Sequence, residues 1–179
     1  MLEILKAPNQ VLSSKSKTVV KIDKSVLKLL EDMKEALASA SDPIGVGLAA
    51  PQVGKSLKIF ITKPNFKSQI YTFINPKIIK SLKKEEKDET KTKKLEGCLS
   101  LPNIWGEVKR YHEIYLEYQD IDGKIHKKKF TGFIATIIQH EMDHLNGILF
   151  PKRVLEQNGT LYKSEKDEKG DDVFEEIKV

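Results

Sequence analysis

Apolar residues recur at helical spacing in two stretches of the chain. In the first, residues 24–40, they form a broad stripe, which predicts an amphipathic helix near the N-terminus that ends before Pro43. The second stretch covers residues 132–146, with Thr131 as its expected N-cap and Gly147 as its expected stop. Its first turns are apolar nearly all round, and this pattern predicts a buried helix.

Shorter segments carry the alternation or the short apolar run that is typical of β-strands. These segments are 57–62, 70–75, 78–82, 113–118 and 124–130, with a hairpin signature at 120–123, and then 161–163 and 173–178. The pattern predicts an α+β fold, with antiparallel or mixed sheets packed around the central buried helix and the other helix near the N-terminus. We expect one domain over residues 1–157, and an acidic C-terminal tail, 158–179, packed on it as a strand or hairpin. Residues 83–94 are almost wholly charged, which predicts a solvated loop.

The composition narrows the class of protein. The chain has 179 residues, and its 31 basic and 26 acidic side chains give a net charge of +5 that is spread along its length. No apolar run approaches the length of a membrane span, and no aromatic residues interleave with a basic stripe. We therefore expect neither a membrane protein nor a specific nucleic-acid-binding surface. Cys98 is the single cysteine and no secretory signal precedes it, which favours a reduced, cytoplasmic protein.

The second predicted helix contains the sequence His-Glu-Met-Asp-His at residues 140–144. Histidines four residues apart lie on one face of a helix, so the imidazoles of His140 and His144 can reach one metal ion. Glu141 stands beside the first histidine, where a carboxylate can take a proton from water. The alternative is that the two histidines cap a core or face solvent, but with Glu141 between them the pattern favours metal binding.

The single cysteine is the candidate third ligand. Thiolate and imidazole both bind zinc or ferrous iron, and one cysteine with two histidines leaves a fourth position for water, as a catalytic site requires. Taken alone, Cys98 is more typical of a small buried apolar residue than of a ligand. The other histidines, His112 and His126, lie in strand-like and highly charged segments, and we interpret them as surface residues.

A third segment, residues 45–54, reads Gly-Val-Gly-Leu-Ala-Ala-Pro-Gln-Val-Gly. By itself it is typical of a flexible turn between a helix and a strand. Taken together, Gly-Val-Gly-Leu-Ala-Ala-Pro-Gln, Glu-Gly-Cys-Leu-Ser and Gln-His-Glu-Met-Asp-His resemble, in this order, the three signature motifs of the peptide deformylase family. The resemblance runs from Leu5 to about Phe150. It implies a metal-dependent hydrolase that removes the formyl group from the formyl-methionine of nascent polypeptides and releases formate.

The resemblance also implies a role for each matching residue. It implies that the metal ligands are Cys98, His140 and His144. Glu141 would be the general acid and base, and the side chain of Gln52 and the backbone N–H of Leu99 would form the oxyanion site. The resemblance implies Fe²⁺ as the usual metal, with Zn²⁺, Ni²⁺ or Co²⁺ able to occupy the same site.

Apolar residues beside the ligands are candidates for the substrate pocket. Phe133 and Ile137 extend the face of the helix that carries the two histidines, and Val46 can join them to hold an unbranched apolar side chain, which is methionine in formylated proteins. Gly47 and Gly97 are the other candidate substrate-binding residues. The alternative is that Phe133 and Ile137 are ordinary core residues.

Two further residues have expected partners. The resemblance suggests that Asp143 pairs with Arg110 to anchor the metal helix, and the alternative is that Asp143 is a surface carboxylate. Trp105, the only tryptophan, lies where many members of the family carry an arginine near the substrate. It either covers the bound peptide or packs on the scaffold at the rim of the site.

The tail departs further from the family, because many bacterial members end in a basic helix that contacts the ribosome. From Glu165 to Val179 this chain has seven acidic residues and three lysines. RNA phosphates repel such a segment. We therefore expect formyl-methionyl nascent peptides as partners. The ribosome is the partner that stays open, and the acidic tail argues against docking through this segment.

Two other classes of function compete with a deformylase. A metallopeptidase shares the His-Glu-x-x-His pattern but usually takes its third ligand from a later histidine or glutamate, and here Glu156 is the first carboxylate after His144. A structural metal protein or an inactive binding module keeps the ligands without turnover. A closed structural site calls for a fourth ligand, so the intact Glu141 and Gln52 favour the enzyme.

Overall fold

The computed structural model describes residues 2–40, 44–65, 67–82, 95–168 and 170–178. The helices are α1 (Lys24–Ser39), α2 (Phe133–Leu145) and α3 (Phe150–Glu156), with short 3-10 helices η1 (Gln10–Ser13) and η2 (Ala50–Val53). The strands are β1 (Gly47–Ala49), β2 (Ile59–Thr62), β3 (Tyr71–Leu82), β4 (Leu95–Cys98), β5 (Leu101–Glu107), β6 (Glu113–Gln119), β7 (Ile125–Thr131), β8 (Leu161–Lys166) and β9 (Asp172–Ile177). No helix in this part of the chain is long and apolar enough to cross a bilayer.

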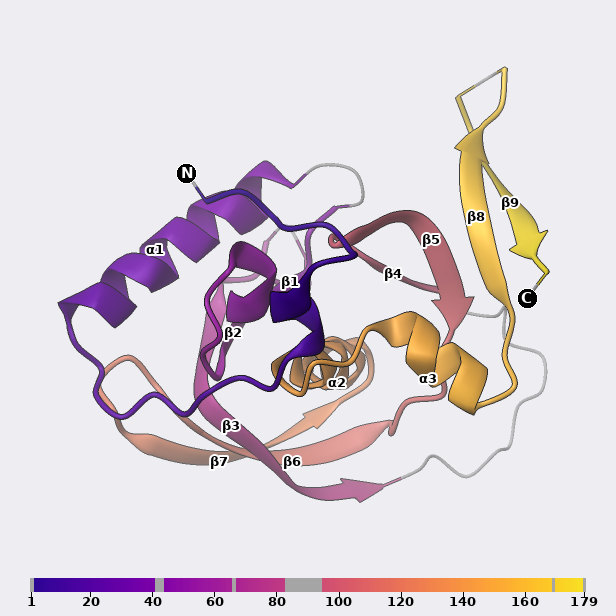
Figure 1. Cartoon of the computed structure of the whole chain (residues 1–179). Helices are drawn as coiled ribbons and strands as arrows, with labels where there is room; N and C mark the ends of the chain where they lie inside the picture. Colours follow the sequence, from indigo (N-terminus) through magenta and orange to yellow (C-terminus); the bar gives the residue numbers. More distant parts are fainter. Residues whose placement is uncertain (1, 41–43, 66, 83–94, 169, 179) are drawn as a thin grey trace.

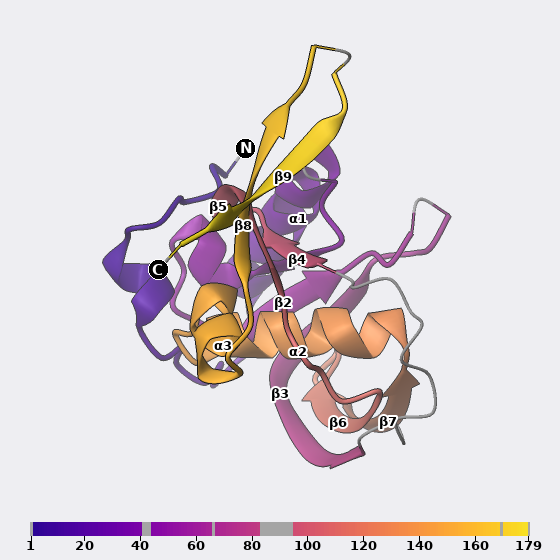
Figure 2. The ribbon, with the colours of Figure 1, turned by 90° about the vertical axis from the view of Figure 1, so that its right-hand side faces the viewer.

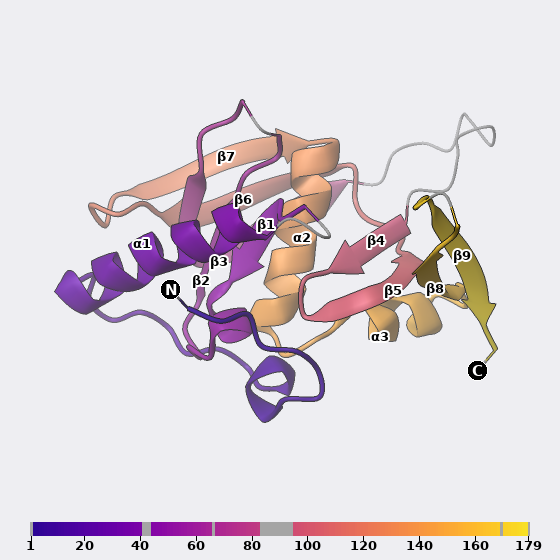
Figure 3. The same cartoon turned by 90° about the horizontal axis from the view of Figure 1, so that it is seen from above.

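The strands form two sheets with α2 between them (Figures 1 and 3). The first sheet has five strands in the order β1-β2-β3-β6-β7, and the second has four in the order β4-β5-β8-β9. Every strand pair in both sheets is antiparallel, which agrees with the expected antiparallel sheets. The helix α2 therefore has neighbours on both sides, and residues on its opposite faces meet different sheets.

The N-terminal helix α1 forms where the apolar stripe predicts it. Asp23 is its N-cap, and the Asp23 carboxylate accepts hydrogen bonds from the backbone N–H groups of Ser25 and Val26. The stripe is buried against β1, β2 and η2 in one apolar cluster, whose fully enclosed members include Met33 and Leu48. This cluster supports β1, which contains the Gly47 and Leu48 of the Gly-Val-Gly-Leu segment.

The strand-like segments expected at 70–75 and 78–82 belong to one strand, β3. Asn75 and Pro76, which lie between them, form an irregularity within this strand. Asn75 has a φ of 51°, and the register with β6 shifts between Ile74 and Lys77. The Asn75 side chain accepts a hydrogen bond from the Val19 N–H and donates one to the Val19 carbonyl, both at 2.8 Å, which holds the irregularity in place.

The hairpin predicted around 120–123 is present between β6 and β7. The Asp120 carboxylate accepts hydrogen bonds from the N–H groups of Asp122 and Lys124, each at 3.0 Å, and Gly123 supplies the positive φ of 78° that closes the turn. Buried residues of this hairpin, such as Ile114 and Leu116, pack against the apolar turns of α2.

The helix α2, which contains the His-Glu-Met-Asp-His sequence, begins one residue later than expected. Thr131 was expected to be its N-cap, but Thr131 is the last residue of β7 and pairs with Glu113. The N-cap is Gly132, whose φ of 65° turns the chain sharply from the strand into α2. The predicted stop at Gly147 is confirmed, because its φ is 69° and its N–H donates to the His144 carbonyl at 3.1 Å.

The second sheet and the helix α3 contain most of the elements that the sequence patterns do not predict. The segments that form β4, β5 and α3 have no clear periodicity. The strands expected at 161–163 and 173–178 are present as the antiparallel hairpin β8–β9, and β8 pairs with β5. Figures 1 and 2 show this hairpin reaching away from the rest of the molecule. The charged segment expected to be a loop, 83–94, lies outside the described residues.

Candidate active site

Three donor atoms, two from the central helix and one from the neighbouring strand β4, lie close together. Cys98 ends β4, whereas His140 and His144 project from one face of α2. One ligand atom of each residue lies within 4.8 Å of the other two, and Cys98 Sγ is 3.2 Å from His144 Nε2. Three such atoms can share one ion at ligand bonds of about 2.0–2.3 Å. Within the described ranges, no other group of histidine, cysteine or acidic residues offers such a site.

A hydrogen bond to Glu96 orients the first histidine. His140 Nδ1 lies 3.1 Å from Glu96 Oε2, an arrangement that places the proton on Nδ1 and leaves Nε2 for a metal ion. Burial by itself raises the pKa of Glu96, but hydrogen bonds from Arg110 and His140 outweigh it and lower the pKa to about 2. Glu96 therefore stays ionised, as a carboxylate that fixes a ligating imidazole must.

The cysteine is held as a thiolate. Burial raises the pKa of Cys98, but His144 and His140 beside the sulfur lower it well below the usual range. One thiolate and two imidazoles are a donor set that suits divalent zinc, iron, cobalt or nickel. His144 Nδ1 is also buried and has no hydrogen-bond partner among the described residues. The residues present therefore fit a divalent metal ion.

Glu141 is buried beside these donors, with 3 % of its surface exposed. Its Oε2 atom has no hydrogen-bond partner among the residues described, and burial raises the pKa of Glu141 to about 7, although the two histidines oppose the rise. A Cβ atom at Gly47 would lie 2.3 Å from Glu141 Oε1. Position 47 must therefore be glycine for the carboxylate to reach the site, which explains the second glycine of Gly-Val-Gly.

The amide of Gln52 is oriented by the backbone of β1. Gln52 Oε1 accepts a hydrogen bond from the Ala49 N–H at 2.8 Å, so the Nε2 group points the other way. Nε2 lies 3.6 Å from Cys98 Sγ and donates to Ser100 Oγ at 3.2 Å. An N–H donor is therefore fixed at the sulfur ligand, on a side chain that is 1 % exposed.

The N-terminal segment holds this part of the site from outside. Lys6 Nζ donates to the Leu99 carbonyl at 2.7 Å, and the Ala7 N–H donates to the Ser100 carbonyl at 2.9 Å. The Leu5 N–H donates to the backbone carbonyl of Gln52 at 2.8 Å. These bonds fasten η2 and the turn after Cys98 to each other. Nothing in the periodicity of this segment indicates that role, because the contacts join residues that are 47 or 93 positions apart in the sequence.

A cleft of about 630 Å³ opens onto Cys98, His140 and Glu141. It brings together every candidate substrate and oxyanion residue of the sequence, namely Val46, Gly47, Gln52, Gly97, Leu99, Phe133 and Ile137. Phe133 is 54 % exposed, which argues against the alternative of an ordinary core residue, whereas Ile137 is buried against Gly47. The cleft is also lined by His112, an exposed residue as expected, and by Trp105 and Tyr111.

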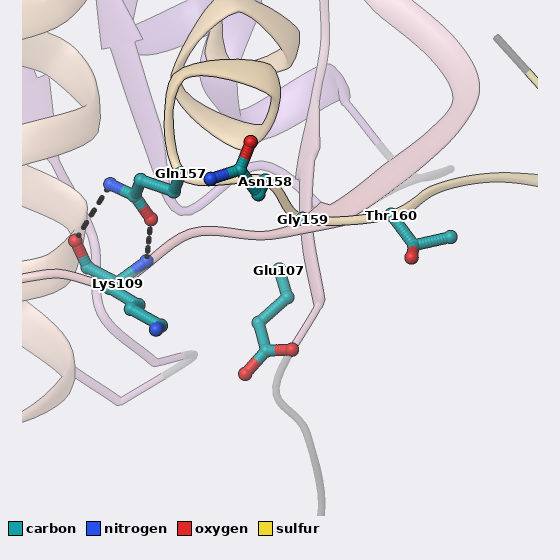
Figure 4. A pocket seen from close by; sticks show the side chains of 6 residues that line it. All are labelled: Glu107, Lys109, Gln157, Asn158, Gly159 and Thr160. Carbon is teal, nitrogen blue, oxygen red and sulfur yellow. Dashed lines mark hydrogen bonds between the residues drawn. The ribbon is translucent and has the colours of Figure 1, made fainter.

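A second, smaller cavity of about 180 Å³ lies elsewhere and shares no lining residue with the cleft (Figure 4). It is lined by Glu107, Lys109 and residues 157–160, and the Gln157 side chain bridges its wall. Gln157 Oε1 accepts from the Lys109 N–H at 2.7 Å, and Gln157 Nε2 donates to the Lys109 carbonyl at 3.3 Å. The candidate metal ligands line neither this cavity nor its rim, so the chemistry is assigned to the larger cleft.

A network of buried charges joins α2 to the second sheet and to α3. Arg110 forms two hydrogen bonds with Glu96, at 2.8 and 2.9 Å, and a third with Asp143 at 2.7 Å. Asp143 is therefore a buried partner of Arg110 and not a surface carboxylate. Arg153 of α3 donates to the other Asp143 oxygen at 2.7 Å. The roles of Glu96 and Arg153 were not predicted from the sequence. The position of Glu96, two residues before the candidate ligand Cys98, could have indicated its role, whereas no sequence pattern indicates the role of Arg153.

The competing classes have less support from this geometry. Glu156, the later carboxylate that a metallopeptidase would need, is exposed on α3 and pairs with Arg153 at 3.0 Å. A closed structural site calls for four protein ligands, and the group found in the described part of the chain has three. The three donors, with a buried carboxylate beside them at the end of an apolar-walled cleft, define the site of a metal-dependent hydrolase.

Comparisons with known proteins identify which hydrolase family this is. The chain matches the family model described as polypeptide deformylase over residues 1–159, and it belongs to this family. Enzymes of the family use one divalent metal ion to remove the N-terminal formyl group from nascent polypeptides.

Individual relatives agree with the family match. A peptide deformylase of Symbiobacterium thermophilum is 44% identical over 151 residues, which are 84% of this chain and 65% of that protein. Peptide deformylase 1 of Bacillus cereus is 40% identical over 154 residues, 86% of this chain and 92% of its own length. The crystal structure of the peptide deformylase from Thermotoga maritima superposes with a TM-score of 0.74 at 35% identity, covering 86% of this chain and 97% of that one.

Proposed function

We propose that this chain hydrolyses the formyl amide of N-terminal formyl-methionine on nascent polypeptides, with Cys98, His140 and His144 holding a single Fe²⁺ ion. The observation that carries the proposal is the meeting of these three donors with the buried Glu141 carboxylate at the end of the cleft. The central helix α2 and its His-Glu-x-x-His pattern supply three of those four groups, and β4 supplies the fourth. Because α2 and β4 are regular elements packed within the fold, they support the relative positions of these four groups.

Ferrous iron is proposed over the other metals on the family resemblance, and Zn²⁺, Ni²⁺ or Co²⁺ can occupy the same donors because all bind thiolate and imidazole. When bound, the ion supplies Lewis acidity, which makes a water molecule easier to deprotonate at neutral pH. Cys98 and His144 are already in contact at 3.2 Å, and His140 is aimed by Glu96, so the donors need little rearrangement.

The residues of the chain carry the remaining steps. Glu141 takes a proton from the attacking water as the water oxygen adds to the formyl carbon. Gln52 Nε2 and the Leu99 N–H donate hydrogen bonds to the formyl oxygen as negative charge grows on it. The carbon–nitrogen bond then breaks, and Glu141 returns the proton to the leaving nitrogen. The products are formate and a free N-terminal amine.

The walls of the cleft select the methionine side chain in this proposal. Val46, Phe133 and Ile137 line the same cleft as Glu141 and His140. Gly47 and Gly97 flank it on β1 and β4, the edge strands of their sheets, where an extended peptide backbone can approach closely. An unbranched apolar side chain fits such a surface better than a charged or branched one.

We propose that the catalytic unit is residues 1–157 and that the hairpin β8–β9 belongs to the same domain. The family match over residues 1–159 supports the first part, and the pairing of β8 with β5 supports the second. The exposed acidic residues of β9, Glu175 and Glu176, disfavour docking of the hairpin on ribosomal RNA. Cosedimentation with ribosomes that disappeared only on deletion of 158–179 would contradict this part of the proposal.

The function is tested by formate release from a formyl-Met-Ala-Ser peptide, with protein that is purified without oxygen and loaded with Fe²⁺. The same peptide carrying an N-terminal acetyl group is the control, since it differs only by one methyl group on the carbonyl carbon. Formate release without acetate release is the expected result. Metal-loaded protein that cleaves neither peptide would instead favour a binding or structural protein.

A separate measurement tests the ligand set without relying on turnover. Loading with Co²⁺ should give the absorption bands of a thiolate-bound ion at one equivalent of metal per chain. The Cys98→Ser variant should lose those bands, whereas a matched variant of the neighbouring turn, Ser100→Ala, should keep them. Equal bands in wild type and Cys98→Ser would remove the cysteine from the ligand set.

A further inference from the structure

Trp105 connects the cleft to the C-terminal hairpin. It lies on β5, lines the cleft, and is the cross-strand partner of Gly97 on β4, the residue before Cys98. Trp105 is the only tryptophan of the chain. None of the steps proposed above uses it, although its indole ring lies close to the groups that carry them out.

The indole ring extends across β4 through the space that a side chain at Gly97 would fill. A Cβ atom at Gly97 would lie 2.8 Å from Cζ3, 2.9 Å from Cε3 and 3.1 Å from Cη2 of Trp105. Gly97 and Trp105 both line the cleft, and β4, over which the ring lies, is the edge strand of its sheet. The benzene part of the indole is therefore a wall of the cleft.

The β8–β9 hairpin also contacts the indole ring of Trp105. The Trp105 Nε1–H group donates a hydrogen bond to Ser164 Oγ of β8 at 2.9 Å, and Ser164 is buried. Phe174 of β9 meets the indole ring edge to face, with 5.8 Å between ring centroids and 85° between planes. Both contacts come from residues beyond 159, where the family match ends.

We propose that Trp105 determines specificity for the part of the peptide that follows the formylated methionine, and that Ser164 and Phe174 are positioning residues that set its ring. The proposal deepens the proposed function and rests on it. The favoured ligand is a peptide with an apolar side chain at its second or third residue.

The spacing along β4 supports this placement. Successive residues of an extended strand advance by about 3.3 Å, and Gly97 directly precedes the sulfur ligand Cys98. A peptide whose formyl group lies at the three donors, and which continues in extended form along the edge of β4, brings its next residues level with the ring. An aromatic face there contributes by apolar contact, and its rigid ring costs little entropy to order.

The test compares two substrates, formyl-Met amide, which ends at methionine, and formyl-Met-Ala-Leu amide, which continues along the cleft. In the Trp105→Ala variant, the ratio of kcat/KM for the long substrate over the short one should fall roughly 10-fold, mainly through KM, the loss expected when an aromatic contact is removed. A ratio within twofold of wild type would overturn the proposal. Failure of wild-type protein to release formate from either peptide would count against the proposed function instead.

Variants of the hairpin test the positioning role without altering the cleft wall. Phe174→Ala and Ser164→Ala should lower the same ratio by a smaller factor, and adding Phe174→Ala to Trp105→Ala should lower it no further. Val173→Ala is the matched control, because Val173 is exposed and alternation along β9 places it on the opposite face of the strand from Phe174.

The single tryptophan supplies a second readout. Its emission in the wild type should change on addition of the product peptide Met-Ala-Leu amide, and should change much less with methionine amide. Phe174→Ala should shift the emission of the free protein, whereas Val173→Ala should leave it unchanged. Equal emission changes with the two products, together with full additivity of the Trp105 and Phe174 variants, would reduce Trp105 to a scaffold residue. The fluorescence and hairpin variants decide the matter even if Trp105→Ala fails to fold.

Discussion

Helix α2 has one buried carboxylate on the side that faces β1 and another on the side that faces α3. The two differ in their hydrogen-bond partners. Glu141 meets Gly47 on the β1 side, and its Oε2 has no hydrogen-bond partner among the described residues. Asp143 meets Arg110 and Arg153 on the other side, with hydrogen bonds at 2.7 Å to each oxygen. An unpaired buried carboxylate costs stability, whereas a fully paired one anchors the helix. In the proposed mechanism, this contrast distinguishes the carboxylate that would transfer protons, Glu141, from the carboxylate that anchors the helix, Asp143.

The largest expected effect is on turnover, in the Glu141→Gln variant. The amide keeps the shape of the side chain but cannot take a proton, so kcat should fall by about 10²–10⁴-fold while metal content stays at one ion per chain. Stability should not fall, because a buried carboxylate without a partner is removed. Formate release, metal analysis and thermal unfolding check the three parts. A rate near wild type would take Glu141 out of the mechanism.

The second effect is on stability, in the Arg110→Met variant. Removing Arg110 leaves Glu96 and Asp143 buried with fewer partners, and the free energy of unfolding should fall by about 3–5 kcal/mol. Urea unfolding measures the change. Lys109→Met is the matched control, since the Lys109 side chain is exposed and its backbone bonds to Gln157 remain. A loss of stability equal to that of the control would contradict the anchoring role.

The third effect is on metal affinity, in the Glu96→Gln variant. Glu96 contacts both His140 and Arg110, so Glu96→Gln should weaken metal binding by about 10–100-fold through misorientation of the imidazole. Competition with a chelator measures the affinity. Glu107→Gln, a change farther along the same sheet, is the comparison. Unchanged affinity in Glu96→Gln would show that the sulfur and His144 dominate binding.

The smallest effect is expected for Arg153→Ala. Its side chain is 33% exposed and solvent screens its bonds, so the free energy of unfolding should fall by no more than about 1 kcal/mol although Asp143 loses a partner. Lys152→Ala, one position earlier and more exposed, gives the baseline. A loss as large as that of Arg110→Met would mean that Arg153 of α3 anchors Asp143 as strongly as Arg110 does.

The sequence predicts well the elements whose pattern is long and regular. The helices α1 and α2 and the β6–β7 hairpin follow from apolar period and turn residues, and the candidate ligands follow from the spacing of two histidines on one helix face. The family resemblance added the pairing of Asp143 with Arg110.

The rest depends on contacts between distant segments. Strands of three or four residues, such as β1 and β4, are too short to show a periodic pattern. The glycines in these strands are explained only by side chains from other elements that pack against them. Gly47 makes room for Glu141, and Gly97 makes room for Trp105. The hydrogen bond of Glu96 to His140 joins residues 44 positions apart, so no local pattern could reveal it. The irregularity at Asn75 is likewise held by a distant contact, because the Asn75 side chain bonds the backbone of Val19, 56 positions away.

The three donor residues belong to different halves of the molecule. Cys98 lies on the four-stranded sheet, whereas His140 and His144 lie on the helix that packs against the five-stranded sheet. An ion bound by all three, as proposed, would link one sheet to the other, and part of its binding free energy would stabilise the packing between them. Hydrogen exchange along β4 and β5 should then slow as the concentration of free metal rises.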